Sequence, residues 1–199
     1  LFRPYSTPEL VLGTLVKRHR TVMRELKARH PSQMIRLRNR FRFDDHQITL
    51  VASLVEKETG AKSERPLIAG VFLNRLSLPT FPSRKLETDP TIVYGCTVPL
   101  KRSDACRQFA GRIRRIHLDD AENPYNTYQH AGLPPGPICN PGRAALLAVI
   151  QPTPSRYIFF VSKNDGTHQF SATFAEHNQA VNLYQRGGGA APAPGPSGP

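Results

Sequence analysis

The sequence contains no tryptophan and only 6 tyrosines among its 199 residues. Proteins that bind single-stranded nucleic acid stack bases on aromatic side chains, so this shortage gives little support for such a role. The sequence also lacks a run of about 18 apolar residues, which a membrane-spanning helix requires, and no signal peptide is visible at its start. Because it begins with Leu1 and not with Met, we expect it to be an excised part of a longer protein.

Cysteine is scarce as well, with three residues, Cys96, Cys106 and Cys139. Their spacing to one another and to histidines does not match a structural zinc site. Cys96 and Cys106 bracket a short loop and could pair in an oxidising compartment, which would leave Cys139 free. The count alone leaves the pairing open.

Acidic residues are few, since 15 Asp and Glu stand against 27 Lys and Arg, for a net charge of +12. This balance favours an anionic partner or surface, such as nucleic acid, anionic lipid or an acidic polymer. Much of the excess lies in residues 17–42 and 101–115, where solvated helix faces explain it equally well. With 39% hydrophobic residues the chain can bury a proper core.

The most informative stretch is residues 44–60, which the sequence predicts to be a helix. Asp44 is a good N-cap, Gln47 can complete a capping box, and Gly60 suits the left-handed position after a helix. Around Val51, the residues of one apolar face are Ile48, Leu54 and Val55. Glu58 falls about 20° from the centre of that face and Glu56 about 140° away, so Glu56 is expected to face solvent.

A glutamate on an apolar face needs a physical explanation, because burying an ionised carboxylate costs several kcal/mol unless it is paired. Glu58 could form an ion pair with a buried arginine. It could instead be a proton donor whose pKa is raised by desolvation, as a general acid requires. The helix alone leaves both open.

Other segments show helical patterns with recognisable ends. Thr7-Pro8-Glu9 predicts a helix to about His30, where Pro31 stops it, and residues 31–43 are expected to be irregular. Ser63 is expected to cap a helix that places Ile68, Val71, Phe72 and Arg75 on one line. Arg75 is thus a second charge on an apolar face, and would be either a partner of Glu58 or a wall of a site.

The middle of the chain is rich in proline and glycine. Residues 77–92 lose periodicity, and Asp89-Pro90-Thr91 forms either a turn or the cap of a short helix through Tyr94. Residues 109–116 are expected to be partly helical. Residues 132–138 are expected to be a loop that either lines a site or serves as a rigid connector between elements.

The C-terminal part combines helices with a hairpin. A helix is predicted from Asn140-Pro141-Gly142 to Ile150, then a buried strand over 156–161, a turn at 164–166 and a partner strand over 167–171. Thr173 and Glu176 predict a capping box for a last helix to about Tyr184. The predicted fold class is therefore α+β, mainly helical, with a small antiparallel sheet near residues 156–171. Residues 187–199 are expected to be a disordered Gly/Pro-rich tail.

Several motifs, in order, resemble the YceG-like endolytic murein transglycosylase family over about residues 45–184. They are Glu56-Lys57-Glu58-Thr59, Glu64-Arg65, Leu73-Asn74-Arg75-Leu76, Thr88-Asp89-Pro90-Thr91, Tyr125-Asn126-Thr127-Tyr128, Gly132-Leu133-Pro134-Pro135-Gly136, Asn140-Pro141-Gly142, His168-Gln169-Phe170-Ser171 and Glu176-His177-Asn178. The resemblance implies a YceG-like catalytic domain over 44–186 with a lytic-transglycosylase-like active site. Residues 1–43 would be a helical segment that follows a LysM-like part missing here.

The resemblance also implies an activity, a partner and a location. The family cleaves peptidoglycan glycan strands internally and leaves 1,6-anhydro-N-acetylmuramic acid ends, without a cofactor or metal. The expected partners are glycan strands and cell-wall synthases, with no nucleic acid. The expected location is the bacterial inner membrane, through a single-pass anchor outside this chain, with the catalytic domain facing the periplasm. In such a compartment a Cys96–Cys106 disulfide is expected.

By resemblance, Glu58 is the catalytic acid and base. The expected substrate-binding residues are Asn74, Arg75, Asp89, Tyr94, Tyr125, Asn126, Thr127 and Tyr128, and the expected supporting residues are Glu64, His168 and His177. Tyr125 and Tyr128 could equally be core aromatics. Where the family usually has Leu-Gln, this chain has Leu86-Glu87, and the extra carboxylate could alter sugar binding. The basic segment around Cys96 and Cys106 also looks particular to this chain.

Two other functions remain open. A non-catalytic basic module that holds acidic cell-wall polymer or nucleic acid would explain the charge but leaves Glu58 unexplained. A metal hydrolase that uses His168 and His177 is less favoured, because the pair lacks an HExxH-like spacing.

Overall fold

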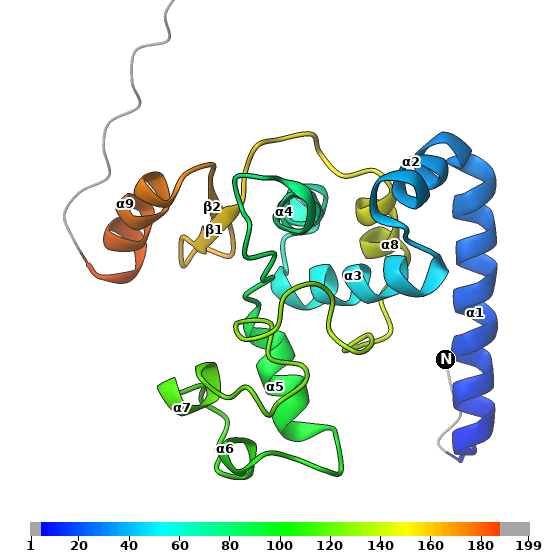
Figure 1. Ribbon diagram of the computed structural model, residues 1–199. Coiled ribbons are helices and arrows are strands. Elements are labelled where there is room, and N and C mark those ends of the chain that lie inside the picture. Colours follow the sequence, from blue (N-terminus) through cyan, green and yellow to red (C-terminus); the bar gives the residue numbers. More distant parts are fainter. Residues whose placement is uncertain (1–4, 188–199) are drawn as a thin grey trace, which may run out of the picture.

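A computed structural model describes residues 5–187. Its elements are α1 (Pro8–Arg29), α2 (Pro31–Phe41), α3 (Asp45–Glu58), the 3₁₀ turn η1 (Lys62–Glu64), α4 (Arg65–Ser77), α5 (Asp89–Thr97), α6 (Asp104–Arg107), α7 (Arg115–Leu118), α8 (Arg143–Ile150), β1 (Phe159–Ser162), β2 (His168–Ser171) and α9 (Phe174–Gln185). In Figure 1, α1 lies at one side of the molecule, α9 and the strands at the other, and α3, α4 and α8 between them. The fold is α+β and mainly helical, which confirms the predicted class.

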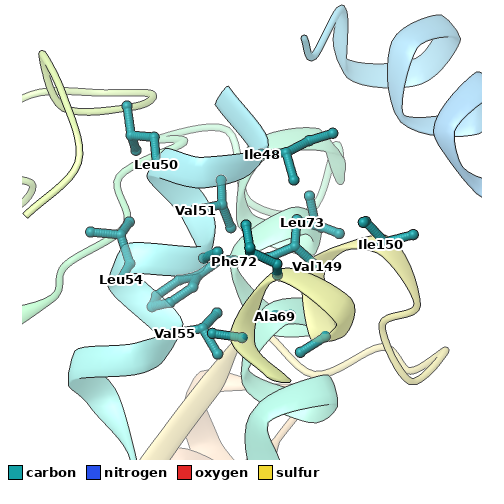
Figure 2. Close-up of a cluster of buried hydrophobic side chains, with 14 of the residues drawn as sticks. Ile48, Leu50, Val51, Leu54, Val55, Ala69, Phe72, Leu73, Val149 and Ile150 are labelled. Carbon is teal, nitrogen blue, oxygen red and sulfur yellow. The ribbon is translucent and has the colours of Figure 1, made fainter. Parts of the chain in front are cut away.

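Helices α3, α4 and α8 pack together around the main hydrophobic core (Figure 2). The side chains of α3 that the sequence assigned to one face are fully buried, including Val51 and Val55. Leu50, Ala52 and Ser53 are buried too, so α3 is enclosed on more sides than its pattern predicts. A helix with this much buried surface is held rigidly, and it fixes the position of the residue at its end, Glu58.

The N-terminal helices rest on the same core. Val22, Met23 and Leu26 of α1 and Leu37 of α2 are buried in it. The expectation that residues 31–43 are irregular was wrong, because α2 occupies most of them. Pro31 has no N–H to offer and suits the first turn of a helix, so it ends α1 and also begins α2.

The start of α3 is as predicted, whereas the predictions for its end and for the next cap were wrong. Asp44 and Gln47 form the expected capping box. After Glu58 the chain leaves the helix through Thr59 in an extended conformation (φ −139°, ψ 136°), so Gly60 is not needed in the left-handed region. Helix α4 begins after Glu64 without a side-chain cap, and Ser63 lies within η1.

The segment between α5 and α8 is held by a disulfide. Of the two forms predicted at Asp89-Pro90-Thr91, the structure has the helix, which follows Thr88 and continues to Thr97. Cys96 and Cys106 are bonded, and among the described residues Cys139 is free. The prediction of helix over 109–116 was largely wrong: Gly111 turns the chain at φ +83°, and only the short α6 and α7 flank it.

Strands β1 and β2 pair antiparallel, with Phe160 opposite Phe170. The turn at 164–166 is as predicted, with Asn164 and Gly166 at positive φ. Strand β1 is half-buried instead of buried, because a two-stranded sheet has few neighbours to cover both faces. Helix α9 begins with the predicted Thr173–Glu176 capping box and packs on this hairpin.

Two predictions concern features outside these elements. Among residues 5–187, none of the helices combines the length and apolar character needed to cross a bilayer. The expected disordered tail lies, apart from Gly187, outside the described residues.

Candidate active site

Glu58 is the last residue of α3, and its half-buried carboxylate accepts a hydrogen bond from the Thr88 hydroxyl just before α5. Burial raises the pKa of Glu58 to about 7, against an ordinary value of 4.5. The Thr88 hydrogen bond and the charge of Arg75 lower this pKa, and the charge of Asp89 raises it. A carboxyl group with a pKa near neutrality can both donate and accept a proton, as general acid–base catalysis requires.

Thr88 is itself held by a small network of buried threonines. Its backbone N–H donates to Thr127 Oγ1 at 3.0 Å. Thr91 Oγ1 donates to the Thr88 carbonyl at 2.7 Å and lies 3.0 Å from Thr127 Oγ1. All three threonines are at most 1% exposed. The hydroxyl that faces Glu58 is therefore fixed by two segments far apart in the sequence.

Asp89 and Tyr128 form the next layer of the site. The Tyr128 hydroxyl donates to Asp89 Oδ1 at 2.7 Å. Burial, and then the negative charge of Asp89, raise the pKa of Tyr128, so this phenol stays protonated at neutral pH. The charges of Glu58 and Glu87 also act on Tyr128, which places these groups close to one another.

Arg75 is a wall of the site and not the ion-pair partner of Glu58. Its guanidinium donates to the carbonyls of Ile158 and Leu86, both at 2.6 Å, and pairs with Glu87 at 3.2 Å. It also lies over the rings of Phe81 and Phe159, at 5.2 and 5.5 Å from their centroids. In the part of the chain that the structure describes, residues 5–187, no ion pair includes Glu58.

Two of the expected substrate-binding residues have their amide groups occupied within the protein. Asn126 is fully buried and donates to three backbone carbonyls, at 2.8 to 3.1 Å. Asn74 Nδ2 donates to the carbonyls of Ser155 and Tyr157, both at 2.9 Å. Both side chains hold loops, so a contribution to the site through these contacts would be positional.

Tyr94 and Tyr125 form a tilted pair with their ring centroids 4.7 Å apart. Both rings pack partly buried against the main core. Of the eight residues expected to bind substrate, the structure therefore brings Arg75, Asp89, Thr127 and Tyr128 around Glu58. Tyr94 and Tyr125 contact each other and form a separate pair.

Glu64 and His168 meet, whereas His177 lies elsewhere. Glu64 accepts from the backbone N–H of His168 at 3.0 Å and lies 2.7 Å from its Nδ1. His177 stacks on Phe159 at 5.0 Å, and burial, helped by the charge of Arg75, lowers its pKa. The two histidines thus contact different neighbours. Among residues 5–187, no three His, Cys, Asp or Glu residues are grouped as a metal site requires.

Glu56 does not face solvent freely, which corrects the prediction from helical phase. It pairs with Arg65 of α4 at 2.9 Å and accepts from the backbone N–H of Gly142, before α8, at 3.2 Å. Its side chain is 28% exposed. Glu56 therefore joins three helices, and it is a structural residue beside the site.

The sequence reasoning missed the role of two residues, Thr88 and Glu87. Thr88 lies within a quoted motif, but only the fold shows that its hydroxyl meets Glu58. Glu87 was singled out for its unusual charge, and in the structure that charge pairs with Arg75. Glu87 also adopts a left-handed φ of 49°, a conformation that no pattern around it in the sequence predicts.

A groove of about 630 Å³ lies beside the site and is here called the α5 groove. It is lined by Lys57, Asp89, Pro90, Val93, Tyr94, Thr97, Val98, Gly111, Arg112, Ile113 and Ile138. Lys57 is the neighbour of Glu58 in the sequence, and the charge of Asp89 raises the pKa of Glu58. One end of the groove therefore lies at Lys57 and Asp89, and the groove extends along α5 to Arg112 and Ile113 of the disulfide-bonded segment.

The raised pKa of Glu58 predicts a pH-dependent difference in stability from Glu58→Gln. Between pH 4.5 and about 7 the unfolded chain ionises Glu58 while the folded protein keeps it protonated, so wild-type stability falls as pH rises. As the pH rises from 4.5 to 8, we expect the free energy of unfolding of the variant to increase by about 3 kcal/mol relative to that of wild type. Urea unfolding of both proteins across this range measures it. A difference independent of pH would contradict the raised pKa.

Residues 1–183 match the family model described as the YceG-like family. An endolytic murein transglycosylase of Bacillus subtilis is 31% identical over 182 residues, which are 91% of this chain and 45% of that protein. One of Streptococcus pneumoniae is 30% identical over 138 residues, 68% of this chain and 23% of that protein. The chain therefore spans less than half the length of these two relatives.

A solved structure shares the fold. The crystal structure of a yceG-like protein from Listeria monocytogenes matches with a TM-score of 0.59 at 31% sequence identity. The match covers 77% of this chain and 44% of that one.

Proposed function

Because the chain belongs to the YceG-like family, we propose that it is the catalytic part of an endolytic lytic transglycosylase of peptidoglycan. Its substrate is the glycan strand, and it cleaves the β-1,4 bond between N-acetylmuramic acid and N-acetylglucosamine. The product end is 1,6-anhydro-N-acetylmuramic acid. Glu58 is the single general acid and base. The names of the relatives from Bacillus subtilis and Streptococcus pneumoniae support the reaction class.

The observation that carries this proposal is the unequal state of three neighbouring carboxyl groups. Glu87 is paired with Arg75, and Asp89 accepts from Tyr128. Glu58 has a hydroxyl donor but no ion-pair partner within residues 5–187, and its pKa is raised to about 7. One carboxyl group is thus poised to carry protons, as expected for a reaction with one acid–base residue.

The proposed reaction consists of two proton transfers through Glu58. Protonated Glu58 donates to the glycosidic oxygen, and the bond from the anomeric carbon to that oxygen breaks. The Glu58 carboxylate then takes the proton of the muramic acid 6-hydroxyl, whose oxygen attacks the same anomeric carbon. The nucleophile belongs to the substrate, so no water is consumed and the attack is intramolecular. A two-carboxylate glycosidase would instead need a second residue as nucleophile or base.

Other residues of the site would assist by position and charge. The carboxylate of Asp89 lies where it can stabilise positive charge that develops at the anomeric carbon. The Thr88 hydroxyl, fixed by Thr127, orients the carboxylate of Glu58. Tyr94 and Tyr125, paired beside the groove, are candidates for contact with a sugar face.

The cellular setting is also part of the proposal. The chain would trim or terminate nascent strands together with cell-wall synthases, outside the cytoplasm. Residues 44–186 would form the catalytic domain, and a LysM-like part and a membrane anchor would precede residues 1–43. The Cys96–Cys106 disulfide is consistent with an oxidising compartment.

Digestion of purified peptidoglycan tests the function. We expect muropeptides with anhydro ends, identified by mass, and activity that is unchanged by a chelator. Since Glu58 must be protonated to donate, kcat/KM should fall as pH rises through about 7. Products with hydrated reducing ends would show a hydrolase, and tight binding without cleavage would favour a non-catalytic cell-wall module.

A further inference from the structure

The α5 groove carries two cations that form no ion pair with the residues that the structure describes. Lys57 and Arg112 are both exposed and line the groove, and neither takes part in an ion pair within residues 5–187. Other arginines of the same basic segment are engaged: Arg107 pairs with Asp104, and Arg115 pairs with Asp119. Lys57 and Arg112 are therefore the cations that this surface offers to a ligand.

The wall that carries Arg112 is fixed in place. The adjacent Ile113 packs against a second small core formed by Ile92, Cys96 and Cys106. The disulfide closes this core, and Tyr128 of the site also packs against it. The disulfide-bonded segment thus holds a cationic wall at a set position relative to the candidate acid.

Most of the remaining lining is apolar, apart from Asp89, Tyr94 and Thr97. Val93 and Val98, both exposed, line the groove together with Ile113 and Ile138. An occupant should therefore carry negative charges and short aliphatic side chains. In a stem-bearing strand the lactyl carboxyl group of muramic acid is bound in the amide to the stem, so the sugars themselves carry no negative charge, whereas the stem carries carboxylates and alanine methyl groups.

We propose that the α5 groove binds the peptide stem of the muramic acid whose bond is cleaved, with Lys57 and Arg112 binding its carboxylates. This inference rests on the proposed function and names its substrate class as peptide-bearing strands. The stem is attached to the same sugar ring that reacts, so it must leave the site across an adjoining surface. The groove begins at Lys57 and Asp89, next to Glu58, and its charge complements that of the stem.

The first test compares glycan strands that keep their stems with strands from which an amidase has removed them, which leaves one lactyl carboxylate on each muramic acid. For Lys57→Gln and Arg112→Gln we expect kcat/KM on peptide-bearing strands to fall about threefold each, and for the double variant about tenfold. In the double variant the loss on peptide-free strands should be at least about fivefold smaller. Lys101→Gln, which removes an exposed charge of the same segment outside the groove, is the matched control and should change neither rate.

A second test needs no turnover. In the Glu58→Gln background, binding of a disaccharide-tetrapeptide is compared with binding of the same disaccharide without peptide. We expect tighter binding of the peptide-bearing compound, a preference that is lost in the double variant and reduced about threefold or more at 0.5 M NaCl.

The outcomes separate the inference from the proposed function. Equal losses on both kinds of strand would overturn the inference, because the groove would then bind the glycan itself. Unchanged preference in the double variant would overturn it as well. If wild type cleaves neither strand, the proposed function fails, and the binding comparison alone decides whether the groove recognises the stem.

Discussion

Glu58→Gln should reduce the release of anhydro-muropeptides by about 10²–10⁴-fold while the protein stays folded. Gln has nearly the same shape and can accept the hydrogen bond from Thr88, but it cannot donate and recover a proton. Because Glu58 has no ion-pair partner within residues 5–187, the substitution leaves no buried cation uncompensated. Activity on purified peptidoglycan and thermal unfolding, measured on the same preparation, check both parts.

Glu56→Gln is the matched control, since it makes the same chemical change two residues away. From its contacts we expect near wild-type activity but a loss of about 1–3 kcal/mol in stability, because the pair with Arg65 is lost. A solvent-facing Glu56, as helical phase predicts, would instead give no change in stability. The two variants should therefore show opposite profiles. Full activity in Glu58→Gln would end the assignment of this residue as the acid.

Local sequence patterns predicted the position of Glu58, the proposed acid, at the end of α3 because both relevant signals lie within one helix. The capping box at Asp44 set the start of α3, and the helical period then placed Glu58 on the apolar face. The period gave the wrong environment for Glu56, since it cannot show that Arg65 and the Gly142 backbone pack against that side. Burial of a helix by several neighbours is a tertiary property.

The partners of the acid could not be predicted from local patterns. Thr88 is 30 residues from Glu58, and the threonine network joins residues 36 to 39 positions apart. Arg75 was recognised as a charge on an apolar face, yet the sequence left open whether it pairs with Glu58 or forms a wall. Its actual acceptors include two backbone carbonyls, which no sequence pattern specifies.

Replacing Arg75 should have the largest effect on stability. The guanidinium is buried and satisfies the carbonyls of Leu86 and Ile158 together with the carboxylate of Glu87. Arg75→Met keeps an apolar stem but leaves these three acceptors without their donor, so we expect a loss of about 3–5 kcal/mol. For a domain of this size the melting temperature should fall by about 10 °C. Calorimetry or circular dichroism during heating measures it.

Two further variants serve as controls for Arg75→Met. Arg75→Lys keeps the charge but lacks the planar fork that reaches several acceptors, so its stability should lie between wild type and Arg75→Met. Arg40→Met removes an exposed arginine that stacks on Phe41 and donates to Ser77, and it should cost less than about 1 kcal/mol. If Arg75→Met melted like wild type, the contacts of Arg75 would not hold the fold together.

The same arginine also links stability to catalysis. Its positive charge lowers the pKa of Glu58, so Arg75→Met should raise that pKa further and move the alkaline fall of kcat/KM to higher pH. Arg75→Lys, which keeps the charge, should leave the fall near that of wild type. The pH profile is measured at a temperature well below the lowered melting point, so that unfolding does not contribute. An unshifted profile in a folded Arg75→Met protein would show that the charge of Arg75 does not reach the acid.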